Sequence, residues 1–295
     1  MNIVKQYIAS LKNIEIEEVA DLIFFRPIAI FFVKVFYLLP ITPNQISFIS
    51  MLFGISSGVF LAQGTKESFL IGGILVLLAQ VIDCCDGMIA RLKKNGTKTG
   101  RIVDGTVDYI TTISIYVGLG IGLTKLVDEK VIDLPMHAWL LVLLYGVFNF
   151  IHAIFTDKYR NRFESYVYKK SLDPESQIKE FEDELGRLKN IKGNYLDKFL
   201  ISAYLKYTKI QSGKTKKEIF DYDTHKYAKA NRVMVLLWNF IGPSEHIFVF
   251  GISMILFQQM IFFYFMVIFS NVWLVILLII QLIIDKKLKK YQISV

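Results

Sequence analysis

Cysteine and histidine are scarce in this chain. Its 295 residues include only 2 cysteines, adjacent at Cys84 and Cys85, and 4 histidines. Adjacent cysteines form neither a disulfide framework nor the paired spacing of a zinc site, and the histidines lack the spacing of metal ligands. The sequence therefore gives little indication of an oxidising compartment, and we expect the two cysteines to be packing residues.

Charged residues are also few, and no segment is typical of a cleaved leader. Charged residues make up 20% of the chain, against 54% hydrophobic residues, and the mean hydropathy is +0.44. This composition excludes a disordered protein and disfavours an ordinary soluble domain. Acidic residues precede the first apolar run and no small-residue cleavage site follows them, so we expect no signal peptide.

Six apolar stretches predict membrane-spanning helices, since about 20 apolar residues cross the roughly 30 Å hydrocarbon core of a bilayer. The fifth stretch is interrupted at Gly242-Pro243, and we place its span after Pro243 and the preceding piece at the interface. The predicted spans are approximately residues 46–62, 69–91, 102–123, 139–155, 247–257 and 261–284.

An earlier apolar segment, Leu22–Leu39, differs from these spans because Arg26, Pro27 and Lys34 interrupt it. A helix that lies in the interface, with Arg26 and Lys34 reaching water, fits this pattern better than a seventh span. The predicted fold class is therefore an all-α membrane protein. It has six transmembrane helices preceded by an interfacial amphipathic helix, with a helical cytoplasmic insertion between spans four and five.

Basic residues are unevenly distributed about these spans. The loops on one side carry only Lys66, Lys125 and Lys130, whereas the other side carries the segment after span four and a basic tail. Because short loops rich in Lys and Arg stay in the cytoplasm, we expect a multi-pass protein of the inner (cell) membrane with both termini cytoplasmic. Topology then explains the net charge of +8, so a nucleic-acid partner is not expected.

These features divide the chain into four parts. Residues 1–43 form an N-terminal cytoplasmic or interfacial segment, and residues 44–156 hold spans one to four. Residues 157–231 form the cytoplasmic helical insertion, which is either a cap on the membrane surface or a substrate-selecting lid. Residues 232–295 hold spans five and six and the basic tail.

Four acids lie within the apolar runs, where charged groups are costly and indicate a functional site. Asp83 and Asp86 end span two, and Asp104 and Asp108 begin span three, so both pairs lie at the cytoplasmic ends of adjacent helices. Spacings of three and four residues place each pair on one helix face. Such a cluster requires neutralisation, and carboxylate oxygens are the ligands that Mg²⁺ and Mn²⁺ prefer.

The neighbours of these acids suit a phosphate ligand, and carboxylate-bound metal pairs serve phosphoryl transfer. Gly87 and Ala90 leave space beside the second span. Gly100 lets a ligand approach the backbone at a helix N-terminus, where phosphate is favoured, and Arg91 offers a fork of donors.

Together these residues resemble the signature of the CDP-alcohol phosphotransferase (phosphatidyltransferase) family. The matching string is Asp83-x-x-Asp86-Gly87-x-x-Ala90-Arg91, then eight residues, then Gly100-x-x-x-Asp104-x-x-x-Asp108. All positions match at the family's spacing. The six spans and Thr42-Pro43-Asn44-x-Ile46-Ser47 extend the resemblance loosely, and the long insertion lies outside it.

The resemblance implies an enzyme that transfers a phosphate-linked group from a CDP-alcohol to an acceptor hydroxyl and releases CMP. By the family's motif, Asp83, Asp86 and Asp104 would ligate two Mg²⁺ or Mn²⁺ ions. Asp108 would help to hold metal and act as general base on the acceptor hydroxyl, which makes Asp104 and Asp108 the catalytic pair. The positions expected to bind the cytidine diphosphate are Gly87, Ala90, Arg91, Gly100, Asn44 and Ser47.

The resemblance also implies partners. We expect a CDP-activated lipid, CDP-diacylglycerol in the first place, a small alcohol acceptor and, because family members are typically homodimers, a second copy of the chain. A basic cluster after span four is either a set of topology anchors or a binding site for an acceptor phosphate; its members are Lys158, Arg160, Arg162 and Arg232.

The acceptor stays open at the level of sequence, because serine, glycerol phosphate, inositol phosphate and choline or ethanolamine chemistries share the signature. Thr99 and Val103 depart from the residues that many members carry beside the signature. The segment Asp83-Cys84-Cys85-Asp86-Gly87 resembles members that handle inositol phosphate.

Several other functions are compatible with part of the pattern. A soluble CDP-alcohol would donate its head group to diacylglycerol if the two substrates exchanged roles. An ion-coupled transporter would explain acids in spans but not the Gly-x-x-Ala-Arg string, and a membrane prenyltransferase would carry its Asp-rich motifs on non-adjacent helices. Four acids with only Arg91 nearby make a poor helix-pairing network. A non-catalytic membrane scaffold is a further alternative, although all four acids are retained.

Overall fold

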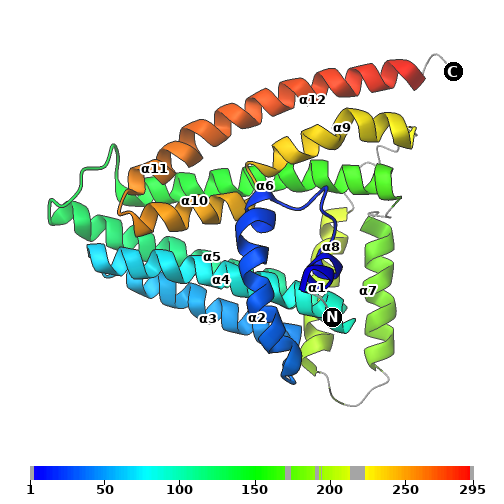
Figure 1. Ribbon diagram of the computed structural model, residues 1–295, viewed down its shortest axis with the longest axis horizontal. Coiled ribbons are helices and arrows are strands. Elements are labelled where there is room, and N and C mark those ends of the chain that lie inside the picture. The colour runs from blue at the N-terminus through cyan, green and yellow to red at the C-terminus, as the bar shows by residue number, and fades with distance from the viewer. Residues whose placement is uncertain (1–2, 170–173, 190–192, 194, 213–222, 293–295) are drawn as a thin grey trace.

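The computed structural model describes residues 3–169, 174–189, 193, 195–212 and 223–292. Within these ranges every regular element is a helix. Six helical stretches are long and apolar enough to cross a membrane, namely Pro43–Leu61, Lys66–Lys93, Lys98–Asp128, Ala138–Tyr168, Thr224–Ile255 and Gln259–Leu288. The chain is a multi-pass helical membrane protein, and the prediction of six spans is confirmed (Figure 1).

The first three long helices begin at threonine caps. They are α3 (Pro43–Leu61), α4 (Lys66–Lys93) and α5 (Lys98–Asp128). The side chain of Thr42 accepts a hydrogen bond from the backbone of Gln45, whose own side chain accepts from the backbone N–H of Thr42 at 2.9 Å. At α5, Thr97 Oγ1 accepts from the backbone N–H of Gly100 at 2.9 Å. These caps satisfy the first free N–H groups and thereby fix where each helix begins.

Helices α3 and α5 are in direct backbone contact. A Cβ atom added at Gly118 would lie only 2.0 Å from the carbonyl oxygen of Gly58, and one added at Gly122 would lie 2.0 Å from that of Leu61. Only glycine permits this approach, which is typical of packed membrane helices. It brings the polar start of α3 beside the start of α5.

Helix α4 is held between α3 and α10 (Pro243–Ile255), which packs on its other side. A Cβ atom at Gly73 of α4 would lie 2.7 Å from the carbonyl oxygen of Gly251. Helix α2 (Arg26–Leu38) also packs against α4 and adds Ile30 and Val33 to the main apolar core. The helix that carries the first two acids is therefore fixed on three sides.

The second half of the chain differs from the predicted boundaries. Its helices are α6 (Ala138–Tyr168), α9 (Thr224–Asn239), α10, α11 (Gln259–Phe263), the π-helical η2 (Tyr264–Phe269) and α12 (Ser270–Gln292). Helix α6 continues beyond residue 155 to Tyr168, because polar residues end the apolar stretch without ending the helix. Helix α9 begins at Thr224, and span five consists of α9 and α10 separated at Gly242.

Between α6 and α9, two helices form a small layer beside the start of α5 (Figure 1). They are α7 (Pro174–Lys189) and α8 (Tyr195–Ser212), and residues 170–173, 190–192, 194 and 213–222 around them lie outside the described residues. Phe181, Leu188, Ile201 and Leu205 form an apolar cluster against which Ile102 of α5 packs. In addition, Lys98 Nζ donates to the carbonyl oxygen of Glu180 at 2.7 Å.

The N-terminal segment contains α1 (Ile3–Ser10) and the π-helical η1 (Asp21–Phe25) before α2. The expectation that Arg26 reaches water is wrong. Its guanidinium lies 2.6 Å from Glu17 and 3.6 Å from Asp21, and its side chain is only 11% exposed. The sequence pattern could not indicate this, because the pairing depends on a turn that brings the acids back over α2.

Glu18, in the turn before η1, joins three distant parts of the chain. Its carboxylate lies 2.6 Å from the Arg160 guanidinium of α6 and accepts from the backbone N–H of Ser244 at 2.7 Å. Burial opposes ionisation of Glu18, but the Arg160 charge and these hydrogen bonds hold its pKa below the usual value. Nearby, burial and then the Glu18 charge raise the pKa of Asp21 to about 6. Glu18 is therefore the ionised partner of Arg160.

Candidate active site

The acids predicted from helical spacing come together in space. Carboxylate oxygens of Asp83, Asp104 and Asp108 all lie within 4.8 Å of one another. Asp86, one turn along α4 from Asp83, interacts electrostatically with both Asp104 and Asp108. Two helix ends thus present four carboxylates to a shared space.

This donor set fits divalent cations. Asp83 Oδ1 is buried, and no hydrogen-bond partner reaches it among the described residues. An unsatisfied buried carboxylate oxygen beside further carboxylates is costly unless a cation balances it. Oxygen ligands of this kind are the ones that Mg²⁺ and Mn²⁺ prefer, so the site fits the predicted metals.

Helix α3 contributes a polar side chain to the same space. Ser47 Oγ donates to the carboxylate of Asp86, and it also contacts the carbonyl oxygen of Pro43 at 3.2 Å. The sequence suggested that Ser47 binds a diphosphate, whereas its recorded contact is with an acid. A hydroxyl in this position orients a carboxylate that would ligate metal.

Small residues leave room on both helices next to the acids. A Cβ atom at Gly100 would lie 3.0 Å from Asn44 Oδ1, which places the Asn44 side chain at the start of α5. A Cβ atom at Gly87 would lie 3.3 Å from both terminal nitrogens of Arg91. The residues predicted to bind a cytidine diphosphate therefore lie around the same ends of α4 and α5, with Ala90 on the intervening turn.

Arg91 also has a contact that the sequence did not indicate. Its Nε donates to the carbonyl oxygen of Ser10, the last residue of α1. The two terminal nitrogens of the Arg91 guanidinium instead lie beside Gly87, one turn earlier on α4. The N-terminal helix thus orients the arginine, which a local motif does not reveal.

A family model describes this region. Residues 40–167 match the model for CDP-alcohol phosphatidyltransferase, and the match includes all four acids, both glycines and the polar start of α3. Residues 40–167 are a CDP-alcohol phosphatidyltransferase domain. The predicted resemblance is therefore confirmed for these residues, and the family is one of transferases that act in phospholipid synthesis.

Curated relatives agree with the family, but this chain matches only a part of each relative's length. A bifunctional IPC transferase and DIPP synthase of Rubrobacter xylanophilus is 34% identical over 83 residues, 28% of this chain and 18% of the relative. A phosphatidylinositol phosphate synthase of Corynebacterium glutamicum is 32% identical over 91 residues, 31% of this chain and 39% of the relative. An archaetidylinositol phosphate synthase of Pyrococcus horikoshii is 31% identical over 84 residues, which are 28% of this chain and 43% of the relative. The chain thus matches less than half of each of these relatives.

The basic residues predicted to bind an acceptor have partners of their own at the edge of the CDP-alcohol phosphatidyltransferase domain. Arg160 pairs with Glu18, Arg162 lies 2.7 Å from Asp285, and Arg232 lies 3.1 Å from Glu15. Lys158 is exposed and lies 5.6 Å from the ring centre of Tyr159. Arg160 links α6 to the N-terminal segment and Arg162 links α6 to α12, and the acceptor role of the set stays a prediction.

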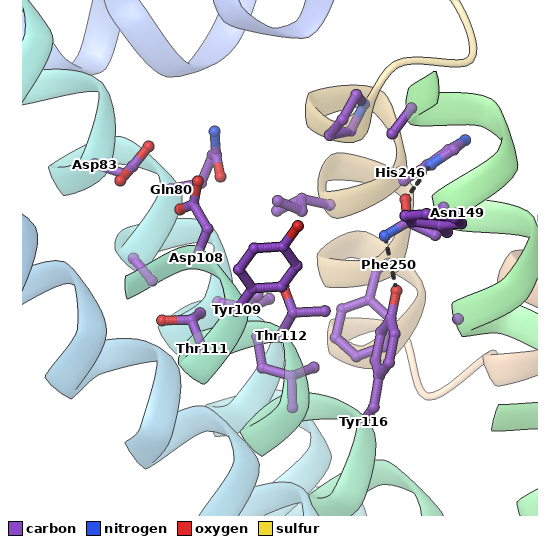
Figure 2. Close-up of a pocket in the computed structure, with 18 of the residues that line it drawn as sticks. Gln80, Asp83, Asp108, Tyr109, Thr111, Thr112, Tyr116, Asn149, His246 and Phe250 are labelled. Atoms are coloured by element: carbon purple, nitrogen blue, oxygen red, sulfur yellow. Dashed lines mark hydrogen bonds between the residues drawn. The ribbon is translucent and has the colours of Figure 1, made fainter. Parts of the chain in front are cut away.

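A cavity of about 530 Å³ opens beside two of the acids of the CDP-alcohol phosphatidyltransferase domain. Its walls come mainly from α4, α5, α6 and α10, with Ser50 of α3 and Phe262 of α11, and it extends past the matched residues 40–167 to include His246 and Phe250. Figure 2 shows Asp83 and Asp108 at one side of this cavity, with Asn149 and His246 at the other. Sequence reasoning missed the far wall, because only the folded helix bundle brings α6 and α10 opposite α5.

Proposed function

We propose that the chain is a phospholipid-synthesising CDP-alcohol phosphotransferase. It transfers a phosphatidyl group from a CDP-lipid, CDP-diacylglycerol, to the hydroxyl of a small alcohol and releases CMP. The observation that carries this proposal is the gathering of Asp83, Asp104 and Asp108 within 4.8 Å, inside a domain of this family.

In this proposal each acid has a definite role. Asp83, Asp86 and Asp104 would hold two Mg²⁺ or Mn²⁺ ions, which when bound neutralise the charge of the diphosphate. The carboxylate of Asp108 takes the proton of the acceptor hydroxyl. The acceptor oxygen forms a bond to the lipid-side phosphorus, and the bond from that phosphorus to the bridging oxygen breaks, so that CMP leaves with the electron pair.

The small residues near the acids would contact the cytidine diphosphate part of the CDP-lipid. Gly87, Ala90, Gly100 and Asn44 would make space for the cytidine diphosphate, and the free fork of Arg91 would bind its phosphate oxygens. We propose an inositol phosphate as acceptor, because two of the matched relatives are named for inositol phosphate products. Lys158, together with Arg160, Arg162 and Arg232, would supply positive charge on the acceptor side.

The topology completes the proposal. Because the loops on one side are rich in Lys and Arg, the active site and both termini would face the cytoplasm at the cell membrane. Helix α2 would lie in the interface within residues 1–43, and residues 44–156, 157–231 and 232–295 would be the remaining parts of the chain. We also propose a homodimer, as an extension from the family.

The proposal is tested by measuring CMP release from the purified full chain in lipid vesicles. We expect release from CDP-diacylglycerol with Mg²⁺ or Mn²⁺ and inositol phosphate, and a return to background when EDTA removes the metal. Serine, glycerol 3-phosphate and inositol serve as competing acceptors. Release that persists in EDTA would contradict the metal assignment.

A second pair of substrates tests the reversed arrangement. Here CDP-choline or CDP-ethanolamine is supplied with diacylglycerol, and CMP release is measured under the same conditions. Release from these donors alone would overturn the CDP-lipid proposal in favour of head-group transfer. Absence of release from every donor would leave a non-catalytic protein and would overturn the enzyme assignment.

Replacing Ser47 with alanine should raise the Mg²⁺ concentration needed for half-maximal CMP release by about tenfold. The reason is that Ser47 Oγ orients the Asp86 carboxylate, whereas it is not itself expected to take part in bond formation. Turnover at saturating Mg²⁺ should change much less.

The matched control for Ser47→Ala is Ser57→Ala, which removes another buried hydroxyl from α3. Ser57 Oγ donates to the carbonyl oxygen of Gly72 at 2.8 Å and contacts none of the acids. If Ser47→Ala and Ser57→Ala have the same Mg²⁺ requirement, Ser47 does not support the metal site.

A further inference from the structure

Three polar side chains form a hydrogen-bonded row on the far wall of the cavity. Asn149 Nδ2 of α6 donates to the hydroxyl oxygen of Tyr116 of α5 at 3.0 Å. His246 Nδ1 of α10 lies 2.8 Å from Asn149 Oδ1 and donates to it when that ring nitrogen is protonated. All three residues belong to helices that are apolar enough to span the membrane, where polar side chains are costly and indicate function.

The cavity joins this row to the acids. Asp83 and Asp108 line it together with Tyr116, Asn149 and His246 (Figure 2). Asp83 Oδ1 and the hydroxyl oxygen of Thr111, which also lines the cavity, are buried without a hydrogen-bond partner among the described residues. Buried polar atoms are normally satisfied, so these two atoms point to a ligand in the cavity.

The remainder of the lining includes further polar residues, among them Gln80 and Asp157, but much of it is apolar. Its apolar residues include Val76, Ile115, Ile247, Phe250 and Phe262. A ligand in contact with the acids, the row and these apolar residues carries charge, a hydrogen-bonding group and apolar groups. A phosphate-linked glycerolipid has all three, whereas a small polar alcohol lacks the apolar groups.

The spacing along α5 is compatible with such a ligand. Asp108 and Tyr116 are eight residues apart, about 12 Å along a helix, and side chains lean toward the N-terminal end of their helix. Figure 2 shows the Tyr116 ring extended toward Asn149, across the cavity from Asp83 and Asp108. This separation lets a ligand whose phosphate lies at the acids bring a glycerol ester group to the Tyr116 hydroxyl.

The hydrogen bonds within the row determine what it offers to a ligand. The Tyr116 oxygen accepts from Asn149, so its own proton is free to be donated. The Asn149 oxygen is engaged by His246, which fixes the amide and leaves one N–H of Asn149 available. The row thus presents donors, and the matching ligand group is a hydrogen-bond acceptor such as an ester carbonyl.

We propose that Tyr116 and Asn149 recognise the ester carbonyl of the lipid donor and make the enzyme selective for ester-linked over ether-linked CDP-lipids. This inference rests on the proposed function, since it assigns a specificity to the same reaction. An ether linkage lacks the carbonyl, so an ether lipid leaves the donors of the row unpaired in an apolar cavity.

The test compares two donors of equal chain length, an ester-linked CDP-diacylglycerol and an ether-linked CDP-dialkylglycerol. CMP release by the full chain is measured in vesicles of one composition, for the natural chain and for Tyr116→Phe and Asn149→Leu. We expect the natural chain to favour the ester donor in kcat/KM by about fivefold or more, the effect of one or two hydrogen bonds. Each variant should reduce that ratio toward one.

The matched control is Ser114→Ala, on the same helix as Tyr116. Ser114 Oγ donates to the carbonyl oxygen of Ile110 at 2.8 Å and does not line the cavity, so this variant should keep the ester preference. An equal rate with both donors in the natural chain, or an unchanged ratio in both variants, overturns the inference. A rise in the KM of the alcohol acceptor with an unchanged donor ratio also overturns it, by assigning the row to the acceptor.

The same assay separates this inference from the proposed function. Absence of CMP release from both donors contradicts the transferase proposal itself. Release with no dependence on Tyr116 or Asn149 retains the transferase and removes only the assigned selectivity.

Discussion

Replacing Asp104 with asparagine should lower metal-dependent CMP release by more than about a hundredfold, because metal ions stabilise a phosphoryl transition state by several kcal/mol. Asparagine keeps the shape of the side chain but removes its charge, and a neutral amide is a weaker ligand than a carboxylate. Asp104 has carboxylate oxygens of Asp83 and Asp108 within 4.8 Å, so loss of its charge weakens the whole donor set. Asp86→Asn should have a similar effect.

The same substitution has a predicted effect on stability that distinguishes a metal site from a structural network. Without metal, Asp104→Asn removes one of several mutually repelling charges, so its thermal midpoint should equal or exceed that of the natural chain. Addition of Mg²⁺ should raise the midpoint of the natural chain but not that of the variant. Both quantities are measured on detergent-solubilised protein over a series of Mg²⁺ concentrations.

The control for this substitution is Asp128→Asn, which removes an exposed acid at the other end of α5. It should affect neither CMP release nor the Mg²⁺ response. Normal turnover in both Asp86→Asn and Asp104→Asn would remove the metal assignment. A large loss of stability in metal-free Asp104→Asn would instead favour a helix-pairing network.

Replacing Gly118 with alanine should destabilise the protein by about 3 kcal/mol, the upper part of the usual range for overpacking. The added methyl group would lie 2.0 Å from the carbonyl oxygen of Gly58, and a backbone atom can move away only if α3 and α5 separate. That loss corresponds to a fall of roughly 6 to 12 °C in the thermal midpoint. Activity should fall as well, because Ser47 and Asn44 of α3 reach the acids and Gly100 through this contact.

Gly105→Ala provides the control for stability, since a Cβ atom at Gly105 of the same helix has no neighbour within 4 Å. This variant should unfold at or above the temperature of the natural chain, because alanine favours a helix more than glycine. Equal midpoints for Gly118→Ala and Gly105→Ala would contradict the close packing of α3 on α5.

Local spacing was sufficient to predict the acidic cluster. The i, i+3 spacing of Asp83 and Asp86, and the i, i+4 spacing of Asp104 and Asp108, each specify one helix face, and adjacent antiparallel helices bring the two faces together. Hydropathy was similarly sufficient for the six spans, since a bilayer demands long apolar helices. Both features are determined by the sequence within one or two neighbouring helices.

Features that depend on distant contacts were not predictable. The contact of Ser47 with Asp86 requires the glycine-mediated approach of α3, and the burial of Arg26 requires Glu17 to fold back over α2. The far wall of the cavity, with Asn149 and His246, follows from how α6 and α10 pack. Hydropathy also placed the end of span four near residue 155, because it detects the end of an apolar stretch rather than the end of a helix.

The contacts of Glu18 have a consequence for the order in which the protein is made. Its partner Ser244 lies 226 residues further along the chain, so a ribosome synthesises most of the protein before that partner exists. Until α10 has been synthesised, the backbone N–H of Ser244, which donates a hydrogen bond to the Glu18 carboxylate in the complete fold, does not exist. The contact that joins the N-terminal segment to α10 can therefore form only late in synthesis, after the helices that carry the acids have been made.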